Sequence, residues 1–367
     1  MPTGMAAVAN QPPDMHGHQK DFKSARLPRL VIEVDRQQTG ATPILLLNDE
    51  GWSRATVFSI ASSQTITLPN FLVIGAGRSG TTSLHHYLMQ HPDVFVPSAK
   101  APSFFYAVDE SPDRRATRDL ATQRSFVRDW DSYVRLFDAW SGQRAVGEVS
   151  PAYLMATGVA SRIADRLPEV RLIAVLRDPL QRVHARYVAR RRDGLERART
   201  FEQVVADEMA RPFDLNDTAG TYVAGGFVSH VIETYLDRFP PERIRFFLHD
   251  DLKYDTSSVV TDLWSFLEVD PRSPAPHDVH NRSGGVISQP LVRAAWTRSA
   301  SIRQRIGPLV PKTWRDRAFR LATRQLAPLE MNATVRARLA DLYEPEVTRL
   351  GQLIKRDLSH WCAREDS

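Results

Sequence analysis

The sequence predicts an α/β fold with a central parallel sheet and helices on both of its faces. Beyond Pro69, short apolar runs of strand length alternate with segments of helical periodicity, which is the pattern of such a sheet. A chain of 367 residues, 42% hydrophobic and 25% charged, is long enough to bury a sizeable core. We therefore expect a large α/β domain with additions at its ends.

The chain before this domain divides into two parts. Residues 1–28 are polar and lack an apolar period, so we predict a flexible tail. Residues 29–68 hold short β-rich runs separated by glycine and serine turns, which predicts a small N-terminal β-rich extension. These runs are residues 30–34, 43–47 and 56–60. The α/β domain with its C-terminal helices then covers residues 69–367.

Local sequence predicts the elements of the domain in order. The predicted core strands are residues 71–74, Arg171–Leu176 and 244–249. The predicted helices that follow them are Thr81–Gln90, residues 180–192 after Pro179, and residues 257–267. A last amphipathic helix has apolar side chains at helical spacing, namely Leu339, Leu342, Tyr343, Val347, Leu350 and Leu353.

Several classes of protein are excluded by what the sequence lacks. Cys362 is the single cysteine, so no internal disulfide and no cysteine-based metal site is expected. No metal-ligand motif is present, and we expect no metal. Apolar runs stop far short of the roughly 20 residues of a membrane-spanning helix, and the first twenty residues lack a signal-peptide centre. We expect a cytoplasmic protein.

A basic stretch near the C-terminus leaves two interpretations open. The net charge is +5, and arginine greatly outnumbers lysine. Residues 293–324 contain many arginines, one acid and two interleaved tryptophans. Such a run is either a solvated helical face with its rings turned inward, or a surface for an anionic glycan or a membrane. No nucleic-acid-binding module accompanies it, so we expect no nucleic acid.

The strongest signal is a glycine-rich turn between the first strand and the first helix of the domain. Residues 75–82 read GAGRSGTT. Glycines let backbone amides turn toward an anion, and the helix that follows presents its unpaired N–H groups and positive dipole end there. The turn therefore predicts a phosphate-binding loop rather than a plain connection.

The loop departs from the nucleoside-triphosphate pattern G-x-x-x-x-G-K-[ST]. Gly75 and Gly80 match its glycines, but Thr81 stands where that pattern has lysine. Arg78 supplies a cation three residues earlier, inside the loop. We infer a ligand with a shorter 5′ substituent than ATP, whose outer group lies beside Arg78. A nucleotide kinase with an altered loop stays open as a competing class.

Residues 71–84 (FLVIGAGRSGTTSL) resemble the 5′-phosphosulfate-binding loop of the sulfotransferase family, whose donor is 3′-phosphoadenosine 5′-phosphosulfate (PAPS). Residues 172–182 (LIAVLRDPLQR) are similar to the strand, Arg-Asp-Pro turn and helix that hold the donor's 3′-phosphate. The resemblance extends over about residues 69–361. It implies a P-loop-NTPase-like three-layer fold and sulfuryl transfer from PAPS without a metal.

The resemblance also implies roles for individual residues. Arg78 occupies the position of a catalytic cation, which stabilises negative charge as the leaving group departs. Thr81 and Thr82 would hold the 5′-phosphate, and Arg177 the 3′-phosphate. The donor-binding residues implied are Gly77, Arg78, Ser79, Gly80, Thr81, Thr82, Arg177, Tyr222 and Arg282.

Two positions depart from the family pattern. Ala101 replaces the glutamate that acts as general base in a Lys-Glu-x-x-Phe-Phe segment, and Ala185 replaces a serine that binds the 3′-phosphate. Glu148 is the residue that we predict in the catalytic base role, although a simple ion pair with an arginine is its alternative. A histidine, His85 or His280, is another candidate. In the opposing interpretation, the chain binds PAPS or its product PAP without turnover.

The acceptor class stays open at this level. We expect a hydroxyl or amine of a glycan, a glycolipid, a small metabolite or a peptide tyrosine. Specificity resides in loops that vary freely on one fold, so no motif in the sequence separates these classes.

Overall fold

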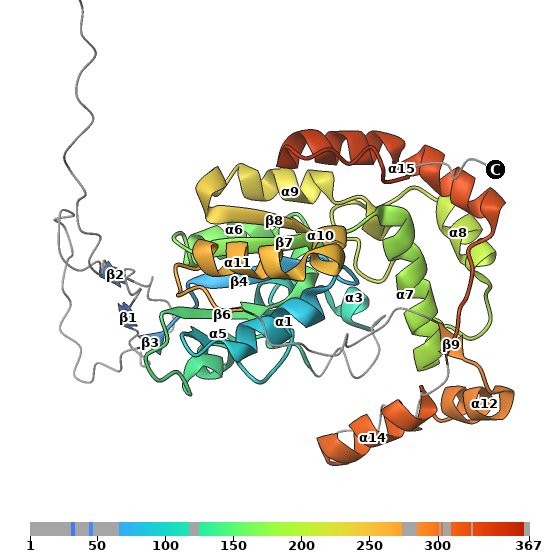
Figure 1. The fold of residues 1–367 in the computed structure, drawn as a ribbon, viewed down its shortest axis with the longest axis horizontal. Helices are drawn as coiled ribbons and strands as arrows, with labels where there is room; N and C mark the ends of the chain where they lie inside the picture. The colour runs from blue at the N-terminus through green and yellow to red at the C-terminus, as the bar shows by residue number, and fades with distance from the viewer. Residues whose placement is uncertain are drawn as a thin grey trace, which may run out of the picture.

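The computed structural model has an α/β fold built around one parallel sheet (Figure 1). It describes residues 31–33, 44–46, 66–116, 125–273, 285–300, 302–303, 310–323 and 326–362. The tail predicted at residues 1–28 lies outside these ranges.

The central sheet has five strands in the order β5-β6-β4-β7-β8, and each neighbouring pair is parallel. The strands are β4 (Phe71–Gly75), β5 (Val94–Phe95), β6 (Ala145–Val149), β7 (Arg171–Leu176) and β8 (Ile244–Leu248). Phe71 of β4 lies opposite Arg171 of β7, so these two strands end at the same edge of the sheet. The glycine-rich turn after β4 is therefore next to the Arg-Asp-Pro turn after β7.

The approach of β6 to β4 requires a glycine. Gly147 lies opposite Phe71, and a Cβ at Gly147 would be 2.4 Å from the Phe71 carbonyl oxygen and 2.6 Å from its ring. No side chain fits this contact. The glycine thus allows β6, and with it Glu148, to pair directly with the strand that leads into the phosphate loop.

Side chains alternate along the central strands between two separate cores. Leu72 and Ile74 of β4 belong to one core, while Phe71 and Val73 belong to the other. All four are at most 1% exposed. Each fully buried side chain of this kind contributes about 1.5–3 kcal/mol. A strand that is apolar on both faces needs a helical layer on each, which confirms the three-layer prediction.

Helices cover each core (Figure 1). The smaller core packs against α1 (Thr81–Gln90), α10 (His249–Tyr254) and α11 (Thr256–Phe266). The larger core packs against α6 (Val159–Arg166), α7 (Pro179–Asp193), α8 (Phe201–Met209), α9 (Ser229–Leu236) and α15 (Ala333–Ile354). Shorter elements are α2 (Phe104–Ala107), α3 (Pro112–Ala116), α5 (Trp130–Val134), η1 (Arg135–Phe137), η2 (Pro151–Met155), η3 (Ala224–Gly226) and η4 (Pro241–Arg243).

The three predicted strands and the helices after them lie within one residue of their predicted bounds. Strands β5 and β6 were not predicted. The first is only two residues long, and the second is interrupted by Gly147 and Glu148, so neither has an apolar run.

The last long helix, α15, packs against the larger core through Leu339, Tyr343 and Val347. Its Glu346 carboxylate accepts hydrogen bonds from the Val228 and Ser229 amides, each at 2.7 Å, at the N-terminus of α9. No helix in the described part of the chain combines the length and apolar character needed to cross a membrane.

Two helices beside the C-terminal end of α7 form what we call the C-terminal arm, namely α12 (Pro290–Arg298) and α14 (Lys312–Ala322) (Figure 1). Strands β9 (Val286–Ile287) and β10 (Leu326–Ala327) pair antiparallel where the arm begins and ends. The basic stretch predicted at residues 293–324 is thus helical over most of its described part.

A separate antiparallel sheet precedes the domain, in the order β2-β1-β3. Its strands are β1 (Val31–Glu33), β2 (Ile44–Leu46) and β3 (Ile66–Thr67). Two of the predicted β-rich runs contain β1 and β2, whereas the third, residues 56–60, lies outside the described residues. The domain boundaries remain predictions.

Candidate anion-binding site

The phosphate loop leaves the end of β4 and enters α1. Arg78 and Gly80 both have left-handed backbone, with φ of 70° and 100°. A Cβ at Gly80 would lie 2.8 Å from a terminal methyl group of Leu252 in α10, so a side chain there would displace Leu252 in addition to straining the backbone. The Ala76 amide donates to the Val175 carbonyl at 2.8 Å, which fixes the loop to β7.

The N-terminus of α1 is open toward the loop. Gly80 is its N-cap residue and, as a glycine, provides no side-chain cap for the amides of the first turn. The first turn carries no acidic residue, so the positive end of the helix dipole is not neutralised from within the helix. Thr81 and Thr82 open the helix beside these amides. A helix end of this kind is a binding site for a phosphate or sulfate group.

Ser79 of the loop has a buried hydroxyl that makes no hydrogen bond to any described residue. The Ser79 amide donates to the Ala76 carbonyl at 3.3 Å, so it is the hydroxyl, and not the amide, that lacks a partner among the described residues. A buried hydroxyl without a partner costs about 1–3 kcal/mol and is rare without a functional reason. A bound anion would accept its hydrogen bond.

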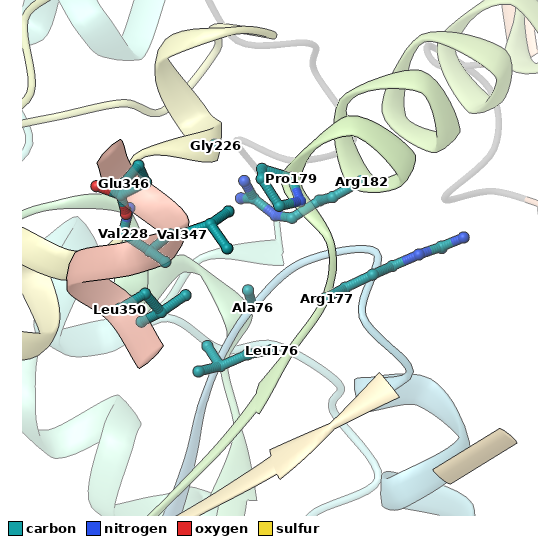
Figure 2. A pocket seen from close by; sticks show the side chains of 10 residues that line it. All are labelled: Ala76, Leu176, Arg177, Pro179, Arg182, Gly226, Val228, Glu346, Val347 and Leu350. Atoms are coloured by element: carbon teal, nitrogen blue, oxygen red, sulfur yellow. The ribbon is translucent and has the colours of Figure 1, made fainter. Parts of the chain in front are cut away.

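Two arginines from the β7–α7 turn hold the loop by its carbonyls. Arg177 Nη1 donates to the Arg78 carbonyl at 3.0 Å, and Arg182 Nε donates to the Gly77 carbonyl at 3.1 Å. Figure 2 shows Arg182 pointing into a cavity of about 10 Å³ behind the loop, whereas Arg177 points away from it. Arg177 Nε is buried without a partner among the described residues and is thus available to a ligand.

Lys100 was not predicted as a site residue, yet it lies at the start of α1. Its Nζ donates to Thr82 Oγ1 at 2.6 Å. Loss of hydration and, second, the nearby charge of Arg78 lower the pKa of Lys100 to about 8. Desolvation also lowers the pKa of Arg78, and the Asp193 carboxylate offsets part of this effect. Two cations therefore stand beside the open helix end.

A row of arginines on α7 adds to this charge. Arg182, Arg186 and Arg190 are spaced by four residues, which places them on one helix face. Desolvation and then the charges of Arg182, Arg190 and Arg78 lower the pKa of Arg186 to about 9. The Arg186 Nε has no partner in the described part of the structure. The spacing was visible in the sequence, but its orientation toward the loop was not.

We call this group of cations, together with the loop and Ser79, the cationic recess. Its cations are Arg78, Lys100, Arg177, Arg182, Arg186 and Arg190. Desolvated like charges repel one another, so the recess is stabilised by an anion that enters it.

Glu148 is held by hydroxyl groups rather than by an arginine, which corrects the ion pair considered as its alternative. Its carboxylate accepts hydrogen bonds from Ser150 Oγ and Tyr153 Oη, both at 2.6 Å. Glu148 is 1% exposed, and burial raises its pKa to about 7 although these hydroxyls act in the opposite direction. Ser150 Oγ also accepts from the Ser103 amide at 2.8 Å. Glu148 thus orients the segment that carries Ala101.

The other substitutes for the missing base are less well placed. His85 is 7% exposed on α1, with its ring 6.1 Å from that of His86. His280 lies outside the described residues. Ala101 has left-handed backbone at φ 55°, and the Ser103 hydroxyl donates to its carbonyl at 3.2 Å. The assignment of a base therefore stays a prediction.

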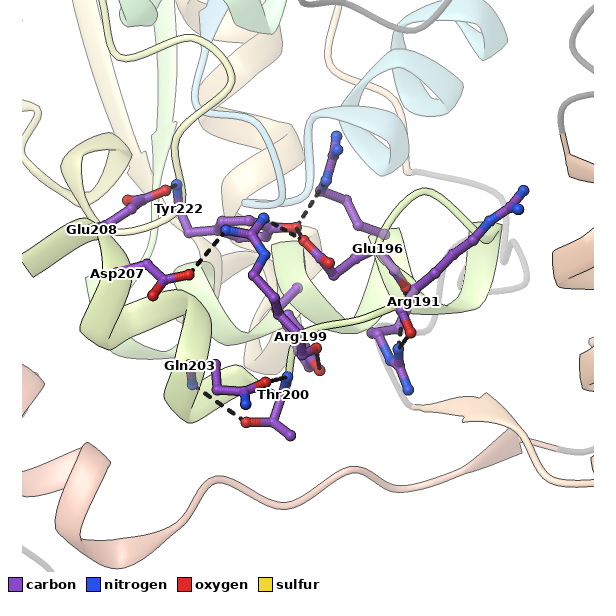
Figure 3. Close-up of polar contacts among 11 residues, drawn as sticks. Arg191, Glu196, Arg199, Thr200, Gln203, Asp207, Glu208 and Tyr222 are labelled. Carbon is purple, nitrogen blue, oxygen red and sulfur yellow. Dashed lines mark hydrogen bonds and ion pairs between the residues drawn. The ribbon is translucent and has the colours of Figure 1, made fainter.

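Tyr222 lies beside the middle of α7 and not at the phosphate loop. Its hydroxyl accepts from Arg190 Nε at 2.9 Å and donates to Glu196 at 3.1 Å, and its amide donates to Glu208 at 2.7 Å (Figure 3). Tyr222 thus contacts the recess through two of its arginines, Arg190 and Arg186, whose guanidinium groups lie 5.8 and 6.0 Å from the centre of its ring. Arg282, the other predicted donor-binding residue beyond α7, lies outside the described residues.

Within the described ranges, no group of three or more histidine, cysteine, aspartate or glutamate residues could hold a metal ion. This observation concerns those residues alone. The chemistry of the recess is that of cations, amides and hydroxyls, all of which bind anions.

Comparison with known proteins gives the context for this geometry. A family model described as "Sulfotransferase family" matches residues 69–273, more than half of the chain. The phosphate loop, Glu148 and the β7–α7 turn all lie within the matched range.

Curated relatives match over part of their length. The bifunctional heparan sulfate N-deacetylase/N-sulfotransferase 3 of Homo sapiens is 26% identical over 208 residues, which are 56% of this chain and 23% of that protein. The membrane-associated sulfotransferase kil1 of Dictyostelium discoideum is 30% identical over 125 residues, 33% of this chain and 23% of that protein. The chain thus spans about a quarter of the length of these relatives.

A solved structure matches much more completely. The crystal structure of a sulfotransferase from Alicyclobacillus acidocaldarius is 29% identical, with a TM-score of 0.62, and covers 81% of this chain and 100% of that chain. The two proteins therefore share the three-layer fold.

Proposed function

The chain belongs to the sulfotransferase family, and we propose that it transfers a sulfuryl group from PAPS to a hydroxyl or amine of an acceptor. The observation that carries this proposal is the phosphate loop, with an uncapped helix end and a buried, unpaired Ser79 hydroxyl. Arg78 and Lys100 add positive charge at the same point. A phosphosulfate is an anion that suits all of these groups.

Different residues of the site would bind the two phosphates of the donor. The Ser79 hydroxyl and the amides and hydroxyls of Thr81 and Thr82 suit the 5′-phosphate, because they lie at the N-terminus of α1. Arg177 suits the 3′-phosphate, because its Nε is unpaired and its guanidinium can form two parallel hydrogen bonds. PAPS, when bound, supplies the sulfuryl group. Gly77 and Gly80 shape the backbone, and Arg282 retains the donor-binding role implied by the resemblance.

Arg78 would act by electrostatics. Transfer of a sulfuryl group leaves negative charge on the phosphate of the leaving group, and a fixed cation stabilises that charge. An arginine starts from a pKa above 12, so Arg78 keeps its positive charge at neutral pH although burial lowers its pKa. Lys100, hydrogen-bonded to Thr82, is a second cation within reach of the same group.

Transfer to a hydroxyl or amine also requires that a base remove a proton from the acceptor. Ala101 provides no carboxylate, and Glu148 is buried with both oxygens bound by hydroxyls. General bases contribute about 10²- to 10⁴-fold, so an acceptor that ionises easily, such as a phenol, needs less assistance. We keep Glu148 as the candidate base. It would accept the acceptor's proton through the hydroxyl of Ser150 or Tyr153, because its own carboxylate is too buried to contact the acceptor.

The acceptor would come from a glycan, a glycolipid or a small metabolite. One curated relative is named as a heparan sulfate N-sulfotransferase, which makes a glycan amine a first acceptor to test. We also propose a cytoplasmic location, for which the single cysteine is the support.

The test is a transfer assay. The protein is incubated with radiolabelled PAPS and fractionated acceptor extracts, and labelled products are read by mass spectrometry for the addition of one sulfuryl group. We expect label in an acceptor with the wild type and at least about 10²-fold less with Arg78→Ala. Tight PAP binding without any transfer would favour a binding protein. Greater thermal stabilisation by ATP than by PAP would favour a nucleotide kinase.

A further inference from the structure

The C-terminal arm presents large apolar side chains to solvent. Leu291 is 85% exposed, Trp314 72% and Leu321 65%, and Ile302, between the two helices, is 59% exposed. Elsewhere in the described residues, three large hydrophobic side chains are comparably exposed, and these are scattered over the surface. Single exposed apolar residues are ordinary, whereas a concentration in one short segment marks an interaction surface.

The exposed residues of α14 lie on one face of the helix. Trp314, Ala318 and Leu321 are spaced by four and three residues, which aligns them. Phe319 lies on the opposite face, where its ring is 6.1 Å from that of Trp296 and 5.2 Å from the Arg192 guanidinium. The helix thus uses one apolar face to pack against the protein, while the other is covered by no described residue.

The neighbouring α12 has the same arrangement. Leu291, Ala295 and Arg298 share one face by their spacing, and all three are exposed. Trp296 is turned inward, with the Arg303 guanidinium 3.6 Å from its ring. The sequence left open whether the tryptophans of the basic stretch turn inward or form part of a binding surface. Trp296 turns inward, whereas Trp314 is exposed and is available to a binding surface.

The charge of the arm is almost entirely positive. Residues 290–323 contain one acidic residue, Asp316. Their basic residues are Arg293, Arg298, Arg303, Arg305, Lys312, Arg315, Arg317 and Arg320. Arg293, Arg298 and Arg317 are exposed beside the apolar face.

We propose that the C-terminal arm docks the protein on an anionic lipid bilayer. Trp314, Leu321 and Leu291 enter the headgroup region, and the exposed arginines bind lipid phosphates. Interfacial helices have this composition, with tryptophan and leucine on one side and arginine around them. The proposal does not depend on the proposed reaction, because the arm contributes none of the residues of the cationic recess.

Two other occupants fit the surface less well. A polyanionic glycan accounts for the arginines but leaves Leu291 and Leu321 exposed to water. A second copy of the arm would cover the leucines but would bring two arginine-rich surfaces together, which is unfavourable. An anionic bilayer satisfies both the charge and the apolar side chains.

The test is flotation of the full chain with vesicles. We expect binding to vesicles of phosphatidylcholine mixed with phosphatidylglycerol, weak binding to phosphatidylcholine alone, and release by salt. The double variant Trp314→Ser/Leu321→Ser should bind at least about tenfold more weakly. Tyr254→Ser, at an equally exposed aromatic residue outside the arm, is the matched control and should bind like the wild type.

A second variant, which changes charge instead of apolar side chains, tests the proposal independently in case Trp314→Ser/Leu321→Ser does not fold. Arg298→Glu/Arg317→Glu should also release the protein from anionic vesicles, with an unchanged unfolding temperature. The proposal is overturned if the wild type does not bind anionic vesicles or if the variants bind as it does. It is also overturned if light scattering shows a dimer that the Trp314 variant dissociates, or if the arm selects a sulfated polysaccharide over vesicles.

Discussion

The cationic recess and the C-terminal arm are both rich in arginine, but they differ in how their charges are hydrated. In the recess, desolvation lowers the pKa of Lys100, Arg78 and Arg186, and several donors have no hydrogen-bond partner among the described residues. In the arm, Arg298 and Arg317 are exposed beside apolar side chains. Desolvated, oriented cations bind one anion in one geometry, whereas solvated cations recognise a charged surface. The same residue type therefore supports a specific site in one region and a docking face in the other.

The largest expected effect is on turnover, and it should differ between an arginine of the recess and an arginine of the arm. Arg78→Ala should lower sulfuryl-transfer turnover by about 10²- to 10³-fold, because it removes the charge that stabilises the leaving group. Arg298→Ala should leave turnover within about twofold, since surface substitutions have small effects. Both are measured with labelled PAPS. Equal losses in the two variants would contradict the distinction between the regions.

Glu148→Gln should change the pH dependence of stability. A buried carboxyl with a pKa of about 7 holds its proton more tightly in the folded chain than in the unfolded chain, where its ordinary value is near 4.5. Its contribution to stability is therefore fully present below pH 4.5 and is lost as the pH rises to about 7, by up to about 3 kcal/mol. The glutamine variant should lack this decline in its free energy of unfolding.

Urea unfolding of both proteins between pH 4.5 and 8 measures this difference. A parallel decline in the variant would show that Glu148 is not the titrating group. A loss of turnover far above tenfold in Glu148→Gln, with the fold intact, would instead support direct proton transfer by this residue.

Lys100 gives a smaller effect that depends on pH. A charge-assisted hydrogen bond to an anion is worth about 1.5–3 kcal/mol, so Lys100→Ala should weaken PAP binding by roughly tenfold or more at neutral pH. Because its pKa is about 8, wild-type affinity should fall as the pH rises through that value. Lys100→Arg should keep the affinity and remove the fall. Calorimetry of PAP binding against pH would decide; identical profiles for all three proteins would exclude Lys100 from the site.

The smallest effect belongs to the arm. Leu321→Ser removes an exposed side chain, so the free energy of unfolding should stay within about 0.5 kcal/mol of the wild-type value. PAP affinity should not change, because no residue of the recess lies on α14. A marked loss of stability in thermal unfolding would show that Leu321 is covered in solution.

Features that depend on local sequence could be predicted. The loop at residues 75–82, the strand before it and the helix after it follow from glycines and apolar runs in one short segment. The layering of helices on both faces follows from strands that are apolar throughout. These features can be predicted without knowing which other parts of the chain each segment contacts.

Features that depend on contacts between distant segments could not be predicted. Lys100 reaches Thr82 only because the chain after β5 returns to the N-terminus of α1. Glu148 is bound by the hydroxyls of Ser150 and Tyr153, which are near it in sequence, but its burial depends on the pairing of β6 with β4, and an ion pair with an arginine was an equally reasonable prediction from sequence. Trp296 faces inward because its side of α12 packs against α14. The sequence of the basic stretch does not show which side of α12 this is.

The central claim is that the cationic recess binds the sulfuryl donor, and a crystal structure of the protein with PAP tests it most directly. The account predicts the 5′-phosphate on the amides at the start of α1, within hydrogen-bond distance of Ser79 Oγ, with Arg177 on the 3′-phosphate. PAP bound elsewhere, or a loop that stays empty at saturating PAP, would contradict it.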